Sequence, residues 1–429
     1  MKYKGFVILL SLLVSNYTFS QESLSLTLQE AQQVALQHNR TLKNASIDVQ
    51  KAEANRWQAI ATMLPQINAT VDYANMLGYK MELFGSSISM PPYANLGITT
   101  SLTFSAAQLI GIEMNKIAVD MTDISLKKTE QQISNQVKTI YYSVLVMEET
   151  VQLLEKNLIN LNNLLVHTQQ SVAVGVMEET DADQLMVQVA SMETNINATK
   201  RSLEMLYNSM RLLLGIDVNT KITLTQTIKD LINIEKAMNL LGDEFVLDKN
   251  YNYQLLKQNI ALSEKQVEIK KWAYAPTISA FHQYSGKYYF SDEKTMNMTP
   301  PNMVGISLNI PIFSSGNKYK ALQEAKFEHN KQLNILEDTK ESLLVQHSQL
   351  RYNLSSSYES YNTQKKNIEV TQRVFDNISR KYEHGMVSSL DVTNTGTNLI
   401  SAQSSYVQSL MELVSAQIAL EELLNIDNK

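Results

Sequence analysis

The feature that most constrains the fold of this 429-residue chain is an internal repeat. Gly175 and Asp181 recur 210 positions later as Gly385 and Asp391, and further pairs share this shift to within one residue. These pairs are Asn39 with Asn250, Pro65 with Pro276, Phe104 with Phe313, and residues 214–217 with 424–427. A period this long excludes a solenoid of short units. The sequence therefore predicts a duplicated domain, with copies at 21–216 and 251–429 around a connector at 217–250.

Each copy is predicted to contain two strands with one apolar and one polar face. Apolar residues alternate with polar or small ones over about 66–75 and 95–104, and again over about 276–285 and 303–313. That period of two is typical of a strand. Pro65 directly precedes the first of these segments, Pro276 begins the third and Pro311 lies near the end of the fourth. Proline cannot donate to a strand ladder. We expect them to form the elbows between strands and helices, and residues 79–92 to form a loop.

Long helices are predicted over about 105–173, 178–214, 315–384 and 388–424. In the first of them, apolar residues are spaced alternately four and three apart from Ile133 to Leu165. This spacing is the seam of a left-handed supercoil. Residues 26–61 are also helical in pattern, with a turn at 38–40. The connector is predicted to hold a short extended segment at 221–225 and a helix at 230–241.

Composition bears on the compartment. Residues 1–20 have the charged start, apolar middle and small-residue end of a secretory signal, with an N-terminal membrane anchor as the alternative. The chain has no cysteine, which excludes a disulfide framework, a thiolate metal site and the lipid anchor of bacterial lipoproteins. A net charge of −6 gives no sign of a nucleic-acid partner. An exported protein is expected.

Four two-faced strands suit a membrane β-barrel, in which outward residues meet lipid and inward residues meet water. Four strands cannot close alone, and hydrocarbon does not tolerate an open sheet edge. Several chains would therefore share one barrel, and three would supply twelve strands. The helices have narrow apolar seams and polar faces elsewhere, which indicates a wall of helices wetted on both sides.

With this combination of a repeat, strands and long helices, the chain resembles the TolC-like outer-membrane efflux family over essentially its whole mature length. The resemblance is carried by the opening helix that ends in LPQI, the two strand pairs, IPIFSSG at 310–316, and the paired Gly-x5-Asp turns. It implies a homotrimer with a twelve-stranded β-barrel in the outer-membrane lipid and a long α-helical coiled-coil barrel in the periplasm. Such a trimer is an exit duct that docks through a periplasmic adaptor protein to an inner-membrane pump or ABC transporter.

The resemblance also implies where functional residues lie. The helix-turn tips, which would dock the adaptor, contain Gly175, Glu178, Asp181, Gly385 and Ser388. Asp391 falls where the family has an acidic pore constriction, and Asn394 stands where a second acid is common. Three Asp391 carboxylates around one axis would favour cations.

Residue chemistry leaves a second interpretation of Asp391 open. Residues 388–391, SSLD, match a capping box, in which Asp391 would bond to a free N–H at the start of a helix. The two roles can coexist, and capping is the stronger expectation for Asp181. For Glu178, a solvated face is a stronger expectation than an adaptor contact. Tyr382 beside the second turn is expected to pack against neighbouring helices.

The sequence gives no support for an enzyme. The six histidines have no metal-ligand spacing, and neither a nucleophile elbow nor a phosphate-binding glycine loop is found. No cofactor or metal is expected. The alternative to a duct is a secreted periplasmic coiled-coil scaffold or adaptor without a pore, which has no need of two-faced strands. The sequence does not decide whether His282 and Tyr284 face the lipid headgroups or the lumen. An aromatic belt at the membrane interface is predicted from the tyrosines near the strand ends, Tyr79, Tyr93, Tyr284, Tyr288 and Tyr289.

Overall fold

The computed structural model describes residues 23–83, 85–231, 234–291 and 300–426, so the predicted signal segment lies outside the described residues. The chain divides into two compact units that both draw on the two sequence copies. The first unit holds residues up to 42, residues 130–244 and residues from 347 onward, and the second holds 43–129 and 245–346. The long helices α3 (Ala106–Ala173) and α8 (Asn317–Glu383) contribute to both units.

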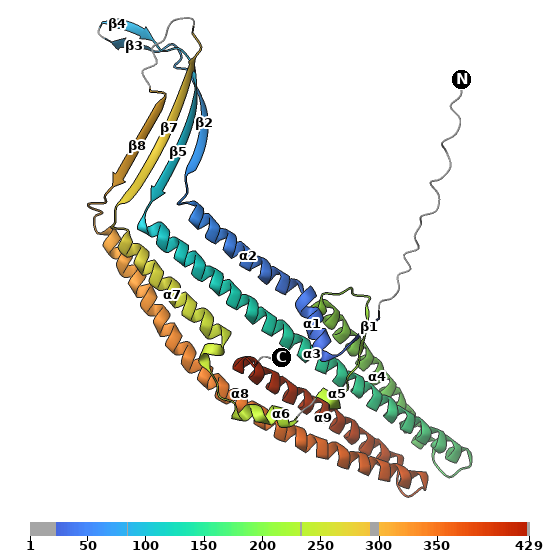
Figure 1. Cartoon of the computed structure of the whole chain (residues 1–429). Coiled ribbons are helices and arrows are strands. Elements are labelled where there is room, and N and C mark those ends of the chain that lie inside the picture. The colour runs from blue at the N-terminus through green and yellow to red at the C-terminus, as the bar shows by residue number, and fades with distance from the viewer. Residues whose placement is uncertain (1–22, 84, 232–233, 292–299, 427–429) are drawn as a thin grey trace, which may run out of the picture. The chain divides into compact units, whose positions relative to one another are not determined.

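The second unit contains a four-stranded antiparallel sheet (Figure 1). Its strands are β2 (Gln66–Ala74), β5 (Tyr93–Phe104), β7 (Thr277–Tyr289) and β8 (Asn302–Asn309), in that order. The helices α2 (Arg40–Ala61) and α7 (Tyr251–Trp272) precede the first strand of each copy. The sheet thus brings together two strands from each copy.

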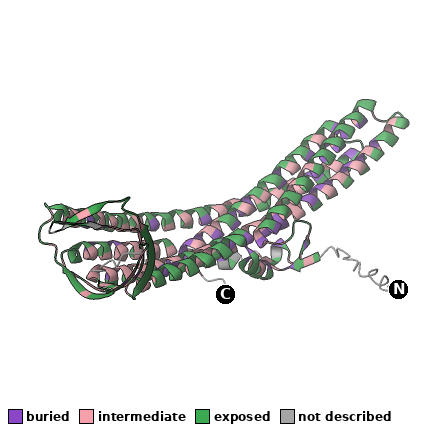
Figure 2. Ribbon diagram, turned by 90° about the horizontal axis from the view of Figure 1, so that it is seen from above, coloured by how far each residue is buried: buried purple, intermediate pink, exposed green. Residues whose placement is uncertain are grey.

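The strand register places most apolar residues of the four strands on one face, with Phe281 and Met303 as exceptions on the other. Ile98 pairs with Ala69 on one side and Tyr284 on the other, and Ala280 lies between Leu102 and Ile306. The opposite face is mainly polar, and some of its side chains hydrogen-bond across strands. Examples are Thr103 to Ser279, with 3.2 Å between the oxygens, and Ser285 to Asn95 at 2.7 Å. In the single chain the outer strands β2 and β8 are mostly exposed, the central strands β5 and β7 are mostly half-buried, and buried residues concentrate along the helices (Figure 2).

Several predicted strand bounds need correction. The strand predicted over 303–313 ends at Asn309, because Pro311 lacks the N–H that a ladder needs. Helix α8 starts at Asn317 rather than 315, after Ser315 and Gly316 adopt positive φ angles of 49° and 80°. Strand β7 extends past 285 to Tyr289, where it still pairs with the beginning of β5.

The loop predicted at 79–92 contains a short hairpin instead. Strand β3 (Lys80–Leu83) pairs antiparallel with β4 (Ser86–Ser89), and Gly85 supplies the positive φ that the tight turn requires. The glycine and serine content that suggested a loop is also compatible with a hairpin turn.

The first unit contains α1 (Leu28–His38), α4 (Glu179–Leu214), α9 (Ser389–Leu424) and the adjoining parts of α3 and α8. The helix predicted from Leu26 begins two residues later, after β1 (Ser23–Leu26), which pairs in parallel with β6 (Lys221–Leu224). Thr27 and Glu30 form a capping box that fixes the start of α1. The helix predicted at 230–241 is instead α5 (Ile228–Leu231), α6 (Ile234–Asn239) and a 3-10 turn, Leu240–Gly242, with 232–233 outside the described residues.

The duplication is repeated in the geometry of the helix ends. Asn39 and Asn250 are both buried, and each accepts hydrogen bonds from two backbone N–H groups at the start of the helix that follows. At the ends of α4 and α9, Gly215 and Asn425 both have left-handed backbones, with φ of 69° and 49°. Asparagine tolerates this conformation better than most residues, which explains how it replaces glycine in the second copy.

Candidate functional site

The predicted tips are two turns with the same backbone geometry. Gly175 and Gly385 have φ of 76° and 68°, and each N–H bonds to the carbonyl three residues earlier at 2.9 Å. The next N–H in each turn reaches the carbonyl five residues back, also at 2.9 Å. These bonds define a Schellman motif, which ends a helix at a left-handed residue. Both turns therefore stop one long helix and redirect the chain into α4 or α9.

Asp391 is exposed and forms the capping box of α9. The Ser388 N–H and hydroxyl donate to Asp391 Oδ2 at 2.9 and 2.7 Å, and the Asp391 N–H donates back to Ser388 Oγ at 3.3 Å. These donors, the hydroxyl first, lower the pKa of Asp391 below its usual value, because they stabilise the carboxylate. Asn394 is exposed one helical turn later on α9. Asp391 is thus an ionised cap with an accessible carboxylate.

Asp181 occupies the equivalent place in α4 but has a second partner. Its Oδ2 accepts from the Glu178 N–H at 3.3 Å, and its Oδ1 accepts from the Ser389 hydroxyl on α9. Ser389 is 2% exposed and also lies 3.1 Å from Gln184 Oε1. Asp181 therefore joins the two turns, whereas Glu178 is exposed beside it.

Just behind the turns, Tyr382 packs in the core of the first unit. Its ring is 1% exposed, among Leu164, Leu185, Phe375 and other apolar side chains from four helices. Its hydroxyl is 2.9 Å from Thr168 Oγ1 on α3. Burial raises the pKa of Tyr382, so the hydroxyl remains protonated and available to hydrogen-bond.

Sequence reasoning missed the residues of α9 that contact the first copy. Ser389, Gly396, Gln403 and Leu410 are spaced seven apart and are all buried. Gln403 Oε1 accepts from Asn157 Nδ2 on α3 at 2.9 Å. The heptad spacing was available in the sequence, but its small and polar members conceal an interface that apolar periodicity alone would not reveal.

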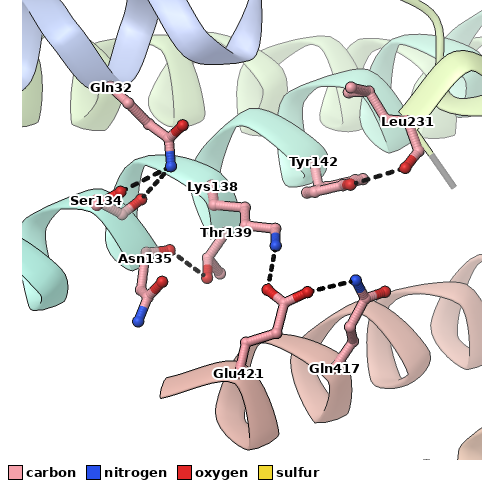
Figure 3. A network of polar contacts seen from close by, with 9 residues as sticks. All are labelled: Gln32, Ser134, Asn135, Lys138, Thr139, Tyr142, Leu231, Gln417 and Glu421. Atoms are coloured by element: carbon pink, nitrogen blue, oxygen red, sulfur yellow. Dashed lines mark hydrogen bonds and ion pairs between the residues drawn. The ribbon is translucent and has the colours of Figure 1, made fainter. Parts of the chain in front are cut away.

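Near the connector (residues 217–250), buried polar contacts join α3 to α9 and to α5 (Figure 3). Lys138 on α3 forms an ion pair with Glu421 on α9, and their side chains are 8% and 2% exposed. Gln417 Nε2 donates to the other oxygen of Glu421 at 2.8 Å, and Tyr142 donates to the Leu231 carbonyl at 3.1 Å. Burial and the neighbouring Glu421 raise the pKa of Tyr142 to about 12. This network links α3 and α9, and it joins α3 to α5 through Tyr142.

The apolar sheet face is the second part of the candidate site. Register assigns His282 and Tyr284, which sequence left open, to the apolar face. Tyr288 lies on that face too, whereas Tyr93 and Tyr289 pair on the polar face with ring centroids 5.8 Å apart. The predicted aromatic belt is therefore divided between the two faces. Pro65 and Pro276 each directly precede a strand, and Pro311 lies between β8 and α8.

Metal and helical-membrane features are not found in the described part of the chain. Its His, Asp and Glu side chains form no cluster of three or more that could bind a metal ion. None of the helices among the described residues is long and apolar enough to cross a membrane.

Comparison with known proteins gives a consistent picture. Residues 31–216 and 246–425 match the family described as outer membrane efflux protein. The outer membrane protein TolC of Salmonella enteritidis is 21% identical over 427 residues, which cover 96% of this chain and 84% of TolC. The CusC structure, solved in a study of transmembrane channel formation, gives a TM-score of 0.77 at 18% identity and covers 92% of this chain and 91% of CusC. The outer membrane protein VceC of Vibrio cholerae gives 0.73 at 15% identity, over 92% of this chain and 95% of VceC.

Proposed function

Since this chain belongs to the outer membrane efflux protein family, we propose that it is the exit duct of a multi-component export system. Three chains would together close a twelve-stranded β-barrel in the outer membrane and a helical barrel in the periplasm. The duct would conduct substrates passively from an inner-membrane pump or ABC transporter, to which a periplasmic adaptor protein joins it.

The observation that carries this proposal is the apolar face shared by all four strands. Val71 on β2 and Ile306 on β8 are 77% and 80% exposed, although both are strongly apolar. Water disfavours so large an apolar surface, and lipid accepts it. The two outer strands of the sheet, β2 and β8, each have an edge that further strands must cover in hydrocarbon. Pairing β8 of one chain with β2 of the neighbouring chain gives both edges a partner strand.

The turns would form the periplasmic end of the duct. Asp391 is exposed on α9, so its carboxylates can ring a threefold axis while each one also caps its own helix. Glu178, Asp181, Ser388 and the two turn glycines would present the surface that the adaptor meets. An acidic ring of this kind favours cations over anions.

Fractionation of cells tests the assignment. We expect the protein in the outer membrane, as a trimer that resists SDS until it is heated. Recovery as a soluble periplasmic monomer would contradict the proposal and would support a scaffold without a pore.

A further inference from the structure

The four strands of the large sheet carry very few formal charges. Within β2, β5, β7 and β8, Asp72 and Lys287 are the only residues that are aspartate, glutamate, lysine or arginine. The polar face of the sheet otherwise consists mainly of hydroxyl and amide side chains. The two charges have opposite signs, so they balance within one chain.

The strand register places both charges on the polar face and in one row across the sheet. Asp72 on β2 pairs with Asn95 on β5, and Asn95 pairs on its other side with Lys287 on β7. Each of the three is the third residue from the end of its strand that does not join a helix. The β3–β4 hairpin is at the same end of the sheet (Figure 1). In the proposed duct this row lines the outer mouth of the barrel.

Contacts in the row keep the two charges apart. Ser285 Oγ on β7 donates to Asn95 Oδ1 at 2.7 Å, so a neutral amide lies between Asp72 and Lys287. Lys287 Nζ lies 5.3 Å from the centroid of the Tyr93 ring, which is within the range of a cation–π contact. Asp72 is exposed. Two strand spacings, about 10 Å in all, separate the Cα atoms of Asp72 and Lys287.

A barrel of three chains repeats this row three times. In the strand order β2, β5, β7, β8, the aspartate is on the first strand and the lysine on the third, so opposite charges alternate at every second strand around the barrel. Barrel strands are tilted by about 35–45°, which staggers the two kinds of charge in height. We propose that this ring of six charges is a charge-balanced filter at the outer mouth. The proposal rests on the proposed function, because it assumes a shared barrel.

The balance of the ring determines how the mouth treats charged solutes. In about 0.1 M salt a charge is screened beyond about 10 Å, so each residue acts on its immediate surroundings while the whole ring sums to zero. Asp72 attracts cationic groups and Lys287 attracts anionic groups of a departing solute. A ring of one sign selects ions of the opposite sign. The balanced ring therefore releases acidic, basic and zwitterionic solutes alike, and loss of either residue makes it selective.

A reporter thiol in the same row tests the filter. Asn95→Cys lies between the two charges and is the only cysteine, because the native chain has none. Intact cells receive a methanethiosulfonate that carries either trimethylammonium or sulfonate, and the ratio of the two rates reports the local potential, since both react with the same thiolate. Adding Lys287→Gln should favour the cationic reagent about threefold, and adding Asp72→Asn should favour the anionic one about threefold. With both added, the ratio should return to that of the reporter alone.

Two further reporters on β5 control for position. Leu96→Cys is the next residue along the strand but lies on the apolar face, so it should react with neither reagent. Thr99→Cys lies on the polar face four residues deeper, which is about 14 Å from Asn95. Because that distance exceeds the screening length, the same two substitutions should leave its ratio nearly unchanged.

The outcomes separate this proposal from the proposed function. An outer-membrane trimer in which the Asn95→Cys ratio ignores both charge substitutions, or in which the combined variant does not restore it, would overturn the filter. An unreactive Asn95→Cys would overturn it too, because the mouth would then be closed to solutes. The duct itself would stand in these cases. Recovery of the reporter variant and the native chain as soluble periplasmic monomers would instead contradict the proposed function.

Discussion

At the scale of single residues, equivalent positions in the two copies have acquired different surroundings. Asp181 and Asp391 both bond to the N–H of the residue three positions earlier, but only Asp181 also accepts from a buried serine on another helix. The capping box at 388–391 could be predicted from the sequence, because it is a local pattern. The Ser389 contact could not, because it depends on how α4 and α9 are rotated against each other.

The cap formed by Asp391 gives a pH-dependent prediction. A carboxylate whose pKa is lowered by folding adds stability that is complete above its unfolded pKa and is lost as the pH falls through the folded value. The thermal midpoint of Asp391→Asn should therefore lie below that of the wild type at pH 7, and the gap should narrow on acidification below about pH 4. Asp183→Asn, an exposed acid outside the capping box, is the control. A gap that persists unchanged at about pH 2 would argue against the charged cap.

The ion pair between Lys138 and Glu421 predicts a non-additive pair of substitutions. Lys138→Met leaves Glu421 buried without its partner, which should destabilise the protein by about 3–5 kcal/mol. Adding Glu421→Leu removes the second charge and should restore most of that loss. Chemical denaturation of the three proteins measures both effects, and equal stability of the single and double variants would refute this account of the network.

At the scale of elements, the positions of strands and helix ends could be predicted better than the pairing of the strands, because positions depend on local sequence and pairing does not. The alternation in 66–75 and 95–104 corresponds to β2 and β5 within two residues. The end of β8 was misplaced because alternation continues through Ile312, past the proline that stops the ladder. Strand β1 was missed because its four residues are stabilised by β6, nearly two hundred residues away in sequence.

Gly215 and Gly385 separate two reasons for a glycine at a helix end. Both have a positive φ, which a residue with a side chain adopts at a cost of about 1–2 kcal/mol. A Cβ on Gly215 would also lie 2.5 Å from the His38 carbonyl oxygen, whereas one on Gly385 would meet nothing within 4 Å. Gly215→Ala should therefore lower the free energy of unfolding clearly more than Gly385→Ala. Equal losses would show that the close approach to α1 is not rigid.

At the scale of the whole molecule, the duplication organises both the fold and the proposed assembly. The sequence predicted the repeat, the two-faced strands and the family, and the family match confirms the resemblance. The order of the strands could not be predicted from the sequence, because β5 pairs with β7, which lies beyond the connector in the chain. That order is what merges four separate apolar faces into one surface.

The apolar face predicts opposite effects for neighbouring residues of β8. Ile306→Lys places a charge on the proposed lipid face and should cost about 2–4 kcal/mol at the bilayer midplane, so outer-membrane assembly should fall. Ser307→Lys places the same charge on the polar face and should assemble normally. Heat-modifiable trimer in membrane fractions measures both variants. A reversed ranking would mean that the assigned faces are exchanged.

The most direct test of the duct is the single-channel conductance of the purified full chain in a planar lipid bilayer. We expect small, cation-selective openings, because the carboxylates of Asp391 would converge at a narrow periplasmic end. Asp391→Ala should raise the basal conductance. Failure of folded protein to insert and conduct under any condition would contradict the central claim that this chain forms a pore.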